Sequence, residues 1–412
     1  MSSPQNISIL DYTYDLPEAR IALHPLQQRD QSKLLVWKNG EIQEDTFINI
    51  TDHLPENSLL VFNNSKVINA RIRFTKSTGS TIEIFCLEPA GSIQDYAVVM
   101  NQKGFSEWKC FIGGVAKWKE EYLVKTIIHQ HLQIELKAKI VNKLNDAYVV
   151  AFEWTPTSIS FAEVLMEAGD IPLPPYIKRD TAIDDADRYQ TIYAKEEGSV
   201  AAPTAGLHFS ENIFSRFESK NIAKAEVSLH VGAGTFKPVK SATMEGHEMH
   251  AEWIDVNRAT LLSLLHQQNE VIAVGTTSLR TLESLYWMGV KSFLHPHLPM
   301  LDIRQWDVYE EELQKPHLSK EKALQSLLTW MERHQKEHLF TQTQLLITPG
   351  YQFRIVQALV TNFHQPQSTL LLLVAAAIGE NWRHCYDYAI ANEFRFLSYG
   401  DGSLIFIHPQ QH

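Results

Sequence analysis

Residues 271–288 read VIAVGTTSLRTLESLYWM, and this stretch decides the fold. Its first part, residues 271–275, is an apolar run that ends in glycine, which predicts a short buried strand. From Ser278 to Met288 the apolar residues return at helical spacing, so we expect a helix directly after the strand. A buried strand that leads into a helix is the repeating unit of α/β proteins.

The same alternation extends along the chain on both sides of this unit. We expect further strands at residues 59–62, 224–231 and 344–348, and helices at residues 160–169, 210–220, 354–360 and 368–378. Strands that alternate with helices in this way predict a parallel α/β sheet or a distorted α/β barrel.

Between residues 72 and 154 the pattern changes to short β-rich runs separated by turn residues. The expected strands are residues 72–74, 81–87, 96–101, 108–112, 122–129, 133–141 and 147–154. Such a series, with no helix in it, predicts a small antiparallel β-barrel or sandwich. Because αβ patterns lie on both sides, we expect an inserted β-barrel domain at residues 67–151. The α/β catalytic domain is then discontinuous and takes residues 1–66 and 152–412.

Composition places few limits on function. The chain has 412 residues, 44% of them apolar and 21% charged, as in ordinary globular proteins. It has no apolar run of about 18 residues and no export signal at its start, and its three cysteines lie far apart, so we expect a cytoplasmic protein without a membrane span. The net charge is −11, but residues 63–150 carry twelve Lys or Arg against eight Asp or Glu, which leaves an RNA partner possible.

Small and polar residues gather where the expected strands end. Residues 188–209 read RYQTIYAKEEGSVAAPTAGLHF, in which nearly bare backbone precedes His208. VSLHVGAGTF, at residues 227–236, contains His230, and TNFHQPQST, at residues 361–369, contains His364. One such cluster is ordinary turn chemistry, and a histidine there can simply be a satisfied core residue. Several clusters at the carboxyl edge of one sheet predict a shared ligand pocket.

Residues 275–280, GTTSLR, place three hydroxyls at the expected start of a helix. Free backbone amides and the helix dipole favour an anion there, such as a carboxylate or a phosphate. Simple capping of the helix by Thr277 or Ser278 is the alternative.

Other patterns in the sequence give weaker support for a functional site. His247 and His250 have a spacing that could bind zinc, but no third ligand is evident, and the absence of a G-x-S-x-G elbow argues against a hydrolase. Charged residues around a proline break near the amino terminus either converge on an anion or pair with each other. These residues are Arg20, Arg29, Asp30 and Lys33.

Taken together, RYQTIYA, AAPTAGLHF, VSLHVGAGTF, MHAEW, VGTTSLRTLES, PGYQF, TNFH and SYGDG resemble the S-adenosylmethionine:tRNA ribosyltransferase-isomerases of queuosine biosynthesis. The similarity runs from residue 15 to residue 407. It implies an α/β domain of distorted-barrel type with an inserted β-barrel. It also implies transfer and isomerisation of the ribosyl part of S-adenosylmethionine onto 7-aminomethyl-7-deazaguanine in a tRNA anticodon, with release of adenine and methionine. No prosthetic group or metal is implied, and we expect a monomer.

This resemblance assigns expected roles to the residues of the clusters. His208 is the first candidate for proton transfer, with His230 and His364 as substitutes. The candidates for substrate binding are Arg188, Tyr189, Gln190, Tyr193, Thr204, Gly206, Gly232, Gly234, Thr235, Thr276, Thr277, Ser278, Arg280, Asn362 and Asp401. The candidates for RNA phosphates are Arg71, Arg73, Lys178 and Arg179.

Some positions differ from the pattern of these enzymes. Asn64, Ser65 and Lys66 stand where an Asp-Thr-Arg-like turn is usual, Gln367 replaces a lysine, and residues 295–343 form a longer segment. Two alternatives therefore stay open: a paralogue that uses S-adenosylmethionine with another acceptor, and a non-catalytic RNA-binding protein.

Overall fold

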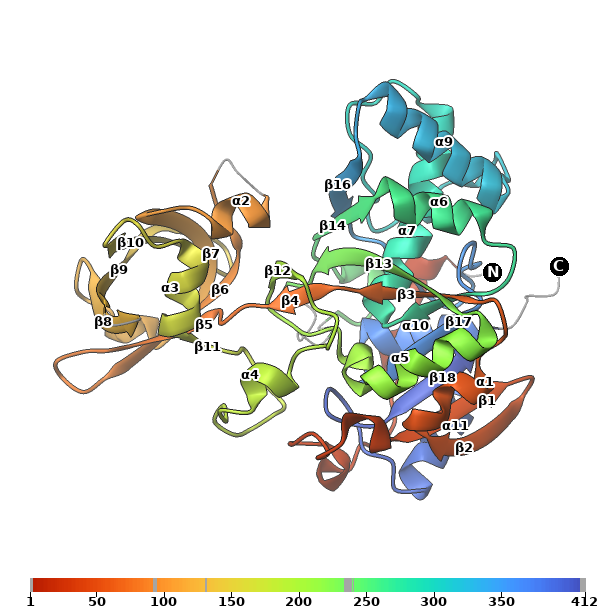
Figure 1. Ribbon diagram of the computed structural model, residues 1–412, viewed down its shortest axis with the longest axis horizontal. Helices are drawn as coiled ribbons and strands as arrows, with labels where there is room; N and C mark the ends of the chain where they lie inside the picture. Colours follow the sequence, from red (N-terminus) through yellow and green to blue (C-terminus); the bar gives the residue numbers. More distant parts are fainter. Residues whose placement is uncertain (1–2, 92–94, 130–131, 233–238, 240, 408–412) are drawn as a thin grey trace.

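The computed structural model describes residues 3–91, 95–129, 132–232, 239 and 241–407. It is a mixed α/β structure with one large sheet and one curled antiparallel sheet that stand side by side (Figure 1). The expected α/β class is thereby confirmed. Residues 271–288 form β15 (Val271–Val274) and most of α7 (Thr276–Leu294). This strand–helix unit lies at the centre of the part that contains the large sheet.

The large sheet has nine strands, and the parallel ones lie at its centre. In spatial order they are β16 (His338–Thr343), β14 (Glu252–Asn257), β13 (Ala223–His230), β3 (Leu59–Asn63), β15, β17 (Ala358–Asn362), β18 (Gly402–Phe406), β1 (Lys33–Lys38) and β2 (Glu41–Thr46). Val61 of β3 lies between Ala225 and Ala273 of its parallel neighbours, and β17 is parallel to β15. The carboxyl ends of β13, β15 and β17 therefore lie at the same edge.

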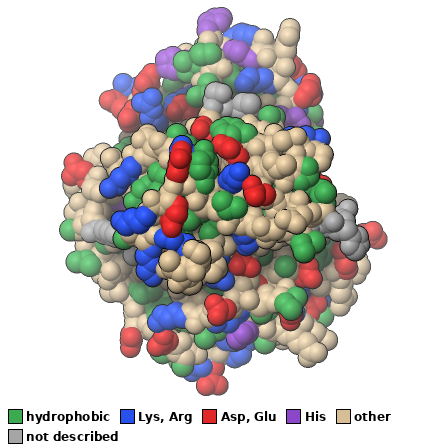
Figure 2. Space-filling view, turned by 90° about the vertical axis from the view of Figure 1, so that its left-hand side faces the viewer, with side chains coloured by type: hydrophobic (Ala, Val, Ile, Leu, Met, Phe, Trp, Pro, Cys, Tyr) green, Lys and Arg blue, Asp and Glu red, His purple; other side chains and the backbone are tan. Residues whose placement is uncertain are grey.

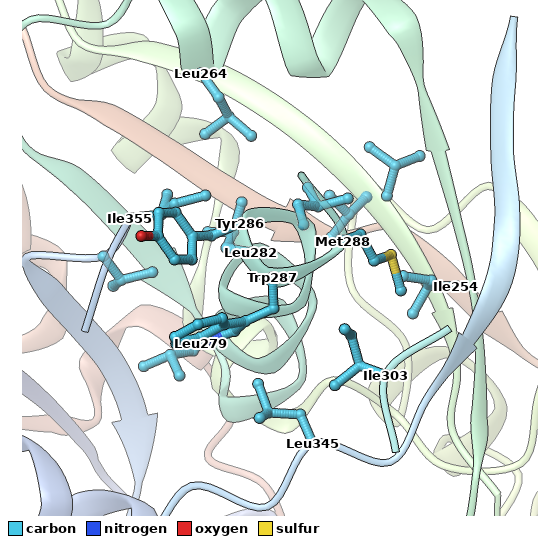
Figure 3. Packing of buried hydrophobic residues seen from close by; sticks show 14 of the residues in the cluster. Ile254, Leu264, Leu279, Leu282, Tyr286, Trp287, Met288, Ile303, Leu345 and Ile355 are labelled. Atoms are coloured by element: carbon cyan, nitrogen blue, oxygen red, sulfur yellow. The ribbon is translucent and has the colours of Figure 1, made fainter. Parts of the chain in front are cut away.

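Helix α7 is buried on nearly all sides, which is why so many of its residues are apolar. Leu279, Leu282 and Trp287 point into a core that includes Leu345 and Ile355 (Figure 3). Other helices of this part are α1 (Ile50–His53), α5 (Glu211–Phe217), α6 (Arg258–His266), α8 (Glu311–Gln314), α9 (Lys320–Arg333), α10 (Thr369–Ile378) and α11 (Asn381–Ala391).

The second sheet is antiparallel and curled. Its strands, in spatial order, are β11 (Gly169–Asp170), β5 (Arg71–Thr75), β6 (Thr81–Pro89), β7 (Phe105–Gly113), β10 (Tyr148–Thr155), β9 (Leu132–Lys143) and β8 (Leu123–His129). In the described part of the chain β11 and β8 are edges, so the sheet is a half-barrel and the expected closed barrel is confirmed only in part. The helices α2 (Tyr96–Met100) and α3 (Phe161–Ala168) contribute to its core.

The curled sheet continues past residue 151, where we expected the insertion to end. Strand β10 runs to Thr155, and β11 adds a further edge strand. A short connection, β4 (Ser65–Val67) paired with β12 (Glu196–Ser199), and α4 (Asp185–Arg188) lie between the two parts (Figure 1). The division into two domains stays a prediction.

Three expected elements are wrong. Residues 96–101 form helix α2, because the Asp95 carboxylate accepts a hydrogen bond from the Val98 amide and caps it. Residues 344–348 lie outside the strands, since β16 already ends at Thr343. Residues 354–360 form no helix, and β17 begins at Ala358.

The reason for the last error lies in a buried carboxylate of α7. Glu283 accepts hydrogen bonds from the amides of Arg354, Ile355 and Val356 and from the hydroxyl of Tyr351, at 2.8–3.0 Å. These bonds fix the segment before β17, and residues 358–362 pair with β15 and β18 instead of forming a helix. Where we expected a parallel sheet or a distorted barrel, the sheet is mixed: β13, β3, β15 and β17 are parallel, whereas β18 runs antiparallel to β17.

Among the described residues, no helix combines the length and apolar character that crossing a membrane requires.

Candidate functional site

A cavity with about 760 Å³ of space, open solvent included, lies at the carboxyl edge of β13, β15 and β17. It brings together four segments that the sequence singled out, namely residues 201–205, 231, 275–277 and 361–365. The lining residues are Tyr176, Ala201, Ala202, Pro203, Thr204, Ala205, Val231, Gly275, Thr276, Thr277, Thr361, Asn362, Phe363, His364, Gln365, Ser368, Leu370, Leu397 and Ser398.

The amino terminus of α7 points into this cavity. Gly275 has φ 91° and ψ 149°, a conformation that glycine adopts far more easily than other residues, and it makes the turn from β15 into α7. No side chain caps the helix, and the Oγ1 atom of Thr277 is buried without a hydrogen-bond partner in the described part of the chain. Unpaired amides and the helix dipole make this end attractive to an anion.

Of the three candidate histidines, His364 lines the cavity. It follows β17, and its Nε2 lies 2.8 Å from the Oγ1 of Thr361. Its backbone amide donates to the Tyr386 hydroxyl at 3.0 Å, and its carbonyl accepts from the Tyr14 hydroxyl. Burial lowers the pKa of His364 to about 4. The ring is therefore neutral at pH 7, so its unprotonated nitrogen can accept a proton.

His208 lies behind the cavity wall and reaches it through Asn362. The Asn362 side-chain amide lies 3.1 Å from Nε2 of His208, and the Ser32 hydroxyl lies 2.8 Å from Nδ1. If the amide donates to Nε2, the proton of the neutral ring is on Nδ1 and is donated to Ser32. Burial, and then the Arg395 guanidinium, lower the pKa of His208 to about 3.

His230 faces the curled sheet and lies outside the cavity lining. Its ring stacks on Tyr96 of α2, with centroids 4.4 Å apart and planes at 9°. Burial lowers the pKa of His230 to about 4. This histidine therefore connects the two parts of the molecule by packing.

Several residues that we expected to bind substrate are instead buried or form hydrogen bonds with other parts of the protein. The side chain of Gln190 bonds both the amide and the carbonyl of Val67. Asp401 accepts from the Lys33 amide and from the amide and guanidinium of Arg395. Tyr189 is fully buried. These residues support the walls of the site rather than facing the cavity.

The structure also shows what surrounds the glycines that we expected to contact the substrate. A Cβ atom at Gly206 would lie 1.9 Å from the hydroxyl oxygen of Tyr193, so Gly206 makes room for that tyrosine. Gly232 has open space at its Cα, whereas Gly234 and Thr235 lie outside the described residues.

At the start of α7, only two of the four expected anion ligands reach the cavity, Thr276 and Thr277. The Ser278 hydroxyl donates to the Val274 carbonyl at 2.7 Å and is fully buried. Arg280 forms a buried ion pair with Glu252 at 2.5 Å and donates to the Leu345 carbonyl.

The four expected RNA contacts are all paired with carboxylates. Arg71 and Arg73 both lie beside Glu83 on the curled sheet. Lys178 pairs with Glu18 at the surface, and Arg179 forms a two-bond pair with the buried carboxylate of Asp185. In Figure 2, which views the molecule from the side of the curled sheet, basic and acidic side chains are mixed.

Ser32 and Tyr176 belong to the site but were not among the expected residues. Ser32 holds His208, and the Tyr176 hydroxyl lies 2.5 Å from the Ser398 hydroxyl at the cavity. Ser32 lies just after Arg29 and Asp30, so that polar run was the available signal. In the described part of the chain, no group of three His, Cys, Asp or Glu side chains is arranged to hold a metal.

Comparison with known proteins adds independent information. The profile of the family described as queuosine biosynthesis protein matches residues 9–405. A protein of Francisella tularensis subsp. novicida, named S-adenosylmethionine:tRNA ribosyltransferase-isomerase, is 36% identical over 403 residues, which cover 96% of this chain and 99% of that protein. Proteins of the same name from Rickettsia bellii and Magnetococcus marinus are 36% and 32% identical and cover 97% and 96% of this chain, and 99% and 93% of their own lengths.

A solved structure of S-adenosylmethionine tRNA ribosyltransferase from Thermotoga maritima is 26% identical, with a TM-score of 0.45 over 96% of this chain and 100% of that one. The family profile and the curated relatives agree along almost the entire length of the sequence. The chain belongs to the queuosine biosynthesis protein family.

Proposed function

We propose that this chain transfers and isomerises the ribosyl moiety of S-adenosylmethionine onto 7-aminomethyl-7-deazaguanine at the wobble position of a tRNA anticodon. The products are epoxyqueuosine-tRNA, adenine and methionine. The observation that carries the proposal is the full-length match to relatives named for this reaction. The position of the cavity at the start of α7 is structural support for the proposal.

The amino terminus of α7 is the proposed site for the methionine carboxylate. Thr276 and Thr277 line the cavity there, and the unpaired Thr277 hydroxyl and the helix amides are donors that a carboxylate can use. Opposite them, the small residues 201–205 allow the nucleoside to approach the backbone closely.

His364 is the proposed proton acceptor. The sulfonium of S-adenosylmethionine acidifies the adjacent 5′ carbon of the ribose, so the reaction needs a base near that carbon. His364 lines the cavity, and its low pKa keeps it neutral before substrate binds. His208, which was our first candidate from the sequence, acts through Asn362 as a positioning residue.

The proposed RNA contacts of the curled sheet are Arg71 and Arg73, with Lys178 and Arg179 nearer the large sheet. Each must exchange its carboxylate partner for an RNA phosphate. For the exposed pairs this exchange costs little, because surface ion pairs contribute about 0–1 kcal/mol. We further propose that the enzyme works as a cytoplasmic monomer without a metal.

The test is to mix the protein, S-adenosylmethionine and tRNA that carries the 7-aminomethyl-7-deazaguanine base, and to follow adenine by chromatography. We expect adenine in proportion to tRNA consumed, and none when the tRNA carries guanine at that position. Folded protein that binds S-adenosylmethionine but releases no adenine with the modified tRNA would overturn the proposal.

A further inference from the structure

A second, smaller cavity lies on the side of His208 away from Asn362. It has about 310 Å³ of space, open solvent included, and its lining holds three arginines, Arg29, Arg188 and Arg395, but no carboxylate. The remaining lining residues are Pro25, Leu26, Ser32, Leu207, His208, Ser398, Tyr399 and Gly400. The roles proposed above leave Arg29 and Arg395 without a function, and Arg188 was expected from the sequence only as a substrate contact.

Within the described residues, the hydrogen bonds of two of the three arginines go to neutral partners. Arg29 donates to the Gln190 carbonyl at 3.1 Å. Arg188 donates to the carbonyls of Leu26 and Gln27 at 2.5 and 3.1 Å. A carbonyl satisfies an N–H group but does not neutralise the positive charge of the guanidinium. Arg395 differs, because it forms an ion pair with Asp401 at 3.0 Å.

These charges are close enough to oppose one another. Burial, and then the Arg188 guanidinium, lower the pKa of Arg29. Asp30 acts in the opposite direction, and its carboxylate also accepts a hydrogen bond from the Ser210 hydroxyl at 2.7 Å. Two like charges held together in a partly buried cavity are unfavourable, and an anion between them removes the repulsion.

The cavity continues into a wider cleft that an extended ligand can enter. This cleft has about 920 Å³ of space, open solvent included, and shares Arg29 and Arg188 with the small cavity. Amide side chains of Gln27, Gln28 and Asn212 line it, together with the carboxylates of Asp30 and Glu211. Arg29 and Arg188 therefore border both the small cavity and the open cleft.

We propose that Arg29 and Arg188, backed by Arg395, form a subsite for a phosphate group of the RNA substrate. The choice of RNA as the source of the phosphate rests on the proposed function, whereas the phosphate chemistry rests on the cavity itself. Guanidinium groups match the oxygens of a phosphate through paired hydrogen bonds, which makes arginine the usual residue for this task. The subsite lies directly beside the His208–Asn362 network and so holds the RNA next to the catalytic cavity.

The experiment measures tRNA affinity, without turnover, for the wild type, Arg29→Gln and Arg188→Gln. We expect each variant to bind about tenfold more weakly, and the slope of log K against log salt to fall by about one. Arg258→Gln is the matched control, since Arg258 pairs with Glu332 between α6 and α9, and its affinity stays within twofold. The shift in melting temperature caused by S-adenosylmethionine stays unchanged in all variants.

A second arm compares two salts, and its first measurement needs only the wild type. Potassium phosphate competes with tRNA more strongly than potassium chloride at equal ionic strength, and Arg29→Gln removes that difference. If phosphate and chloride act alike and both variants bind tRNA within twofold of the wild type, the subsite is refuted. If both arginine variants bind tRNA more weakly but the wild type releases no adenine, the phosphate subsite is supported and the proposed ribosyl transfer is refuted.

Discussion

At the scale of single residues, buried polar groups determine what each candidate histidine can do. His208, His230 and His364 all come from clusters that the sequence singled out, yet they lie in three different surroundings. His364 lines the cavity, His208 is held by Ser32 and Asn362, and His230 stacks on Tyr96. The sequence predicted that histidines gather at the strand ends. It could not predict which ring faces the cavity, because that depends on contacts with residues far away in the chain.

His364→Gln tests the proposed proton acceptor. Glutamine can still hydrogen-bond the Thr361 hydroxyl, so the loop after β17 keeps its support, but the side chain no longer accepts a proton. We expect adenine release to fall about 100-fold or more, since general base catalysis contributes about 10²–10⁴. Chromatographic rates with saturating substrates measure this, and His338→Gln, at an exposed histidine paired with Asp255, is the control. A rate within a few-fold of the wild type contradicts the role.

The three buried histidines also make stability depend on pH. Their pKa values in the folded protein are about 3 for His208 and about 4 for His230 and His364, below the ordinary value of 6.5. The unfolded chain therefore binds more protons below pH 6.5, and stability present above that pH is lost as the pH falls toward 4. Between pH 6.5 and 5.5 we expect each histidine to cost about 1 kcal/mol of unfolding free energy.

Urea unfolding at these two pH values measures the effect. His230→Phe should remove about one third of it, because two of the three histidines remain. An unfolding free energy that does not change between pH 6.5 and 5.5 would contradict the burial of neutral histidines.

At the scale of elements, the strand–helix unit of residues 271–288 was predicted well because it is local. Its apolar run and helical spacing lie within one segment, and β15 and α7 follow them. The prediction failed at residues 354–360, where Glu283 of α7 holds three amides from a distant segment. It failed at residues 96–101 because a cap at Asp95 decided between strand and helix. A pattern read along the chain contains no information on such partners.

Gly275→Ala tests whether the turn between β15 and α7 shapes the site. An added Cβ atom finds space, with Thr277 Oγ1 at 3.5 Å, but φ of +91° is strained for alanine. We expect a loss of about 1–3 kcal/mol in unfolding free energy and weaker binding of S-adenosylmethionine.

Chemical denaturation and isothermal titration calorimetry measure the two effects. Gly91→Ala is the control, since Gly91 has no positive φ and no atom near the added Cβ. Full stability and full affinity in Gly275→Ala would show that the turn does not need glycine.

At the scale of the whole molecule, two sheets of different kind meet at a stacked pair of rings, among other contacts. Tyr96 belongs to α2 in the core of the curled sheet, and His230 ends β13 of the large sheet. The change near residue 72 to short β-rich runs separated by turn residues predicted the separate β-rich part. The order of the nine strands and the antiparallel placement of β18 could not be predicted, because β18 lies between β17 and β1, and β1 comes from the start of the chain.

The role of His230 follows from this position. His230→Phe keeps a ring against Tyr96 and removes a buried Nδ1 atom that lacks a partner in the described part of the chain. We therefore expect it to retain adenine release within a few-fold, whereas His230→Ala loses about 2 kcal/mol of unfolding free energy. A stable His230→Phe protein that is about 100-fold slower would instead assign proton transfer to His230.

Ribosyl transfer itself is the central claim, and isotope transfer tests it most directly. S-adenosylmethionine labelled in its ribose carbons is incubated with the protein and the tRNA that carries 7-aminomethyl-7-deazaguanine, and the label in tRNA is compared with free adenine. The account predicts one labelled ribosyl group in tRNA for each adenine released. Adenine without label in the tRNA, or neither product from folded protein that binds both substrates, would contradict it.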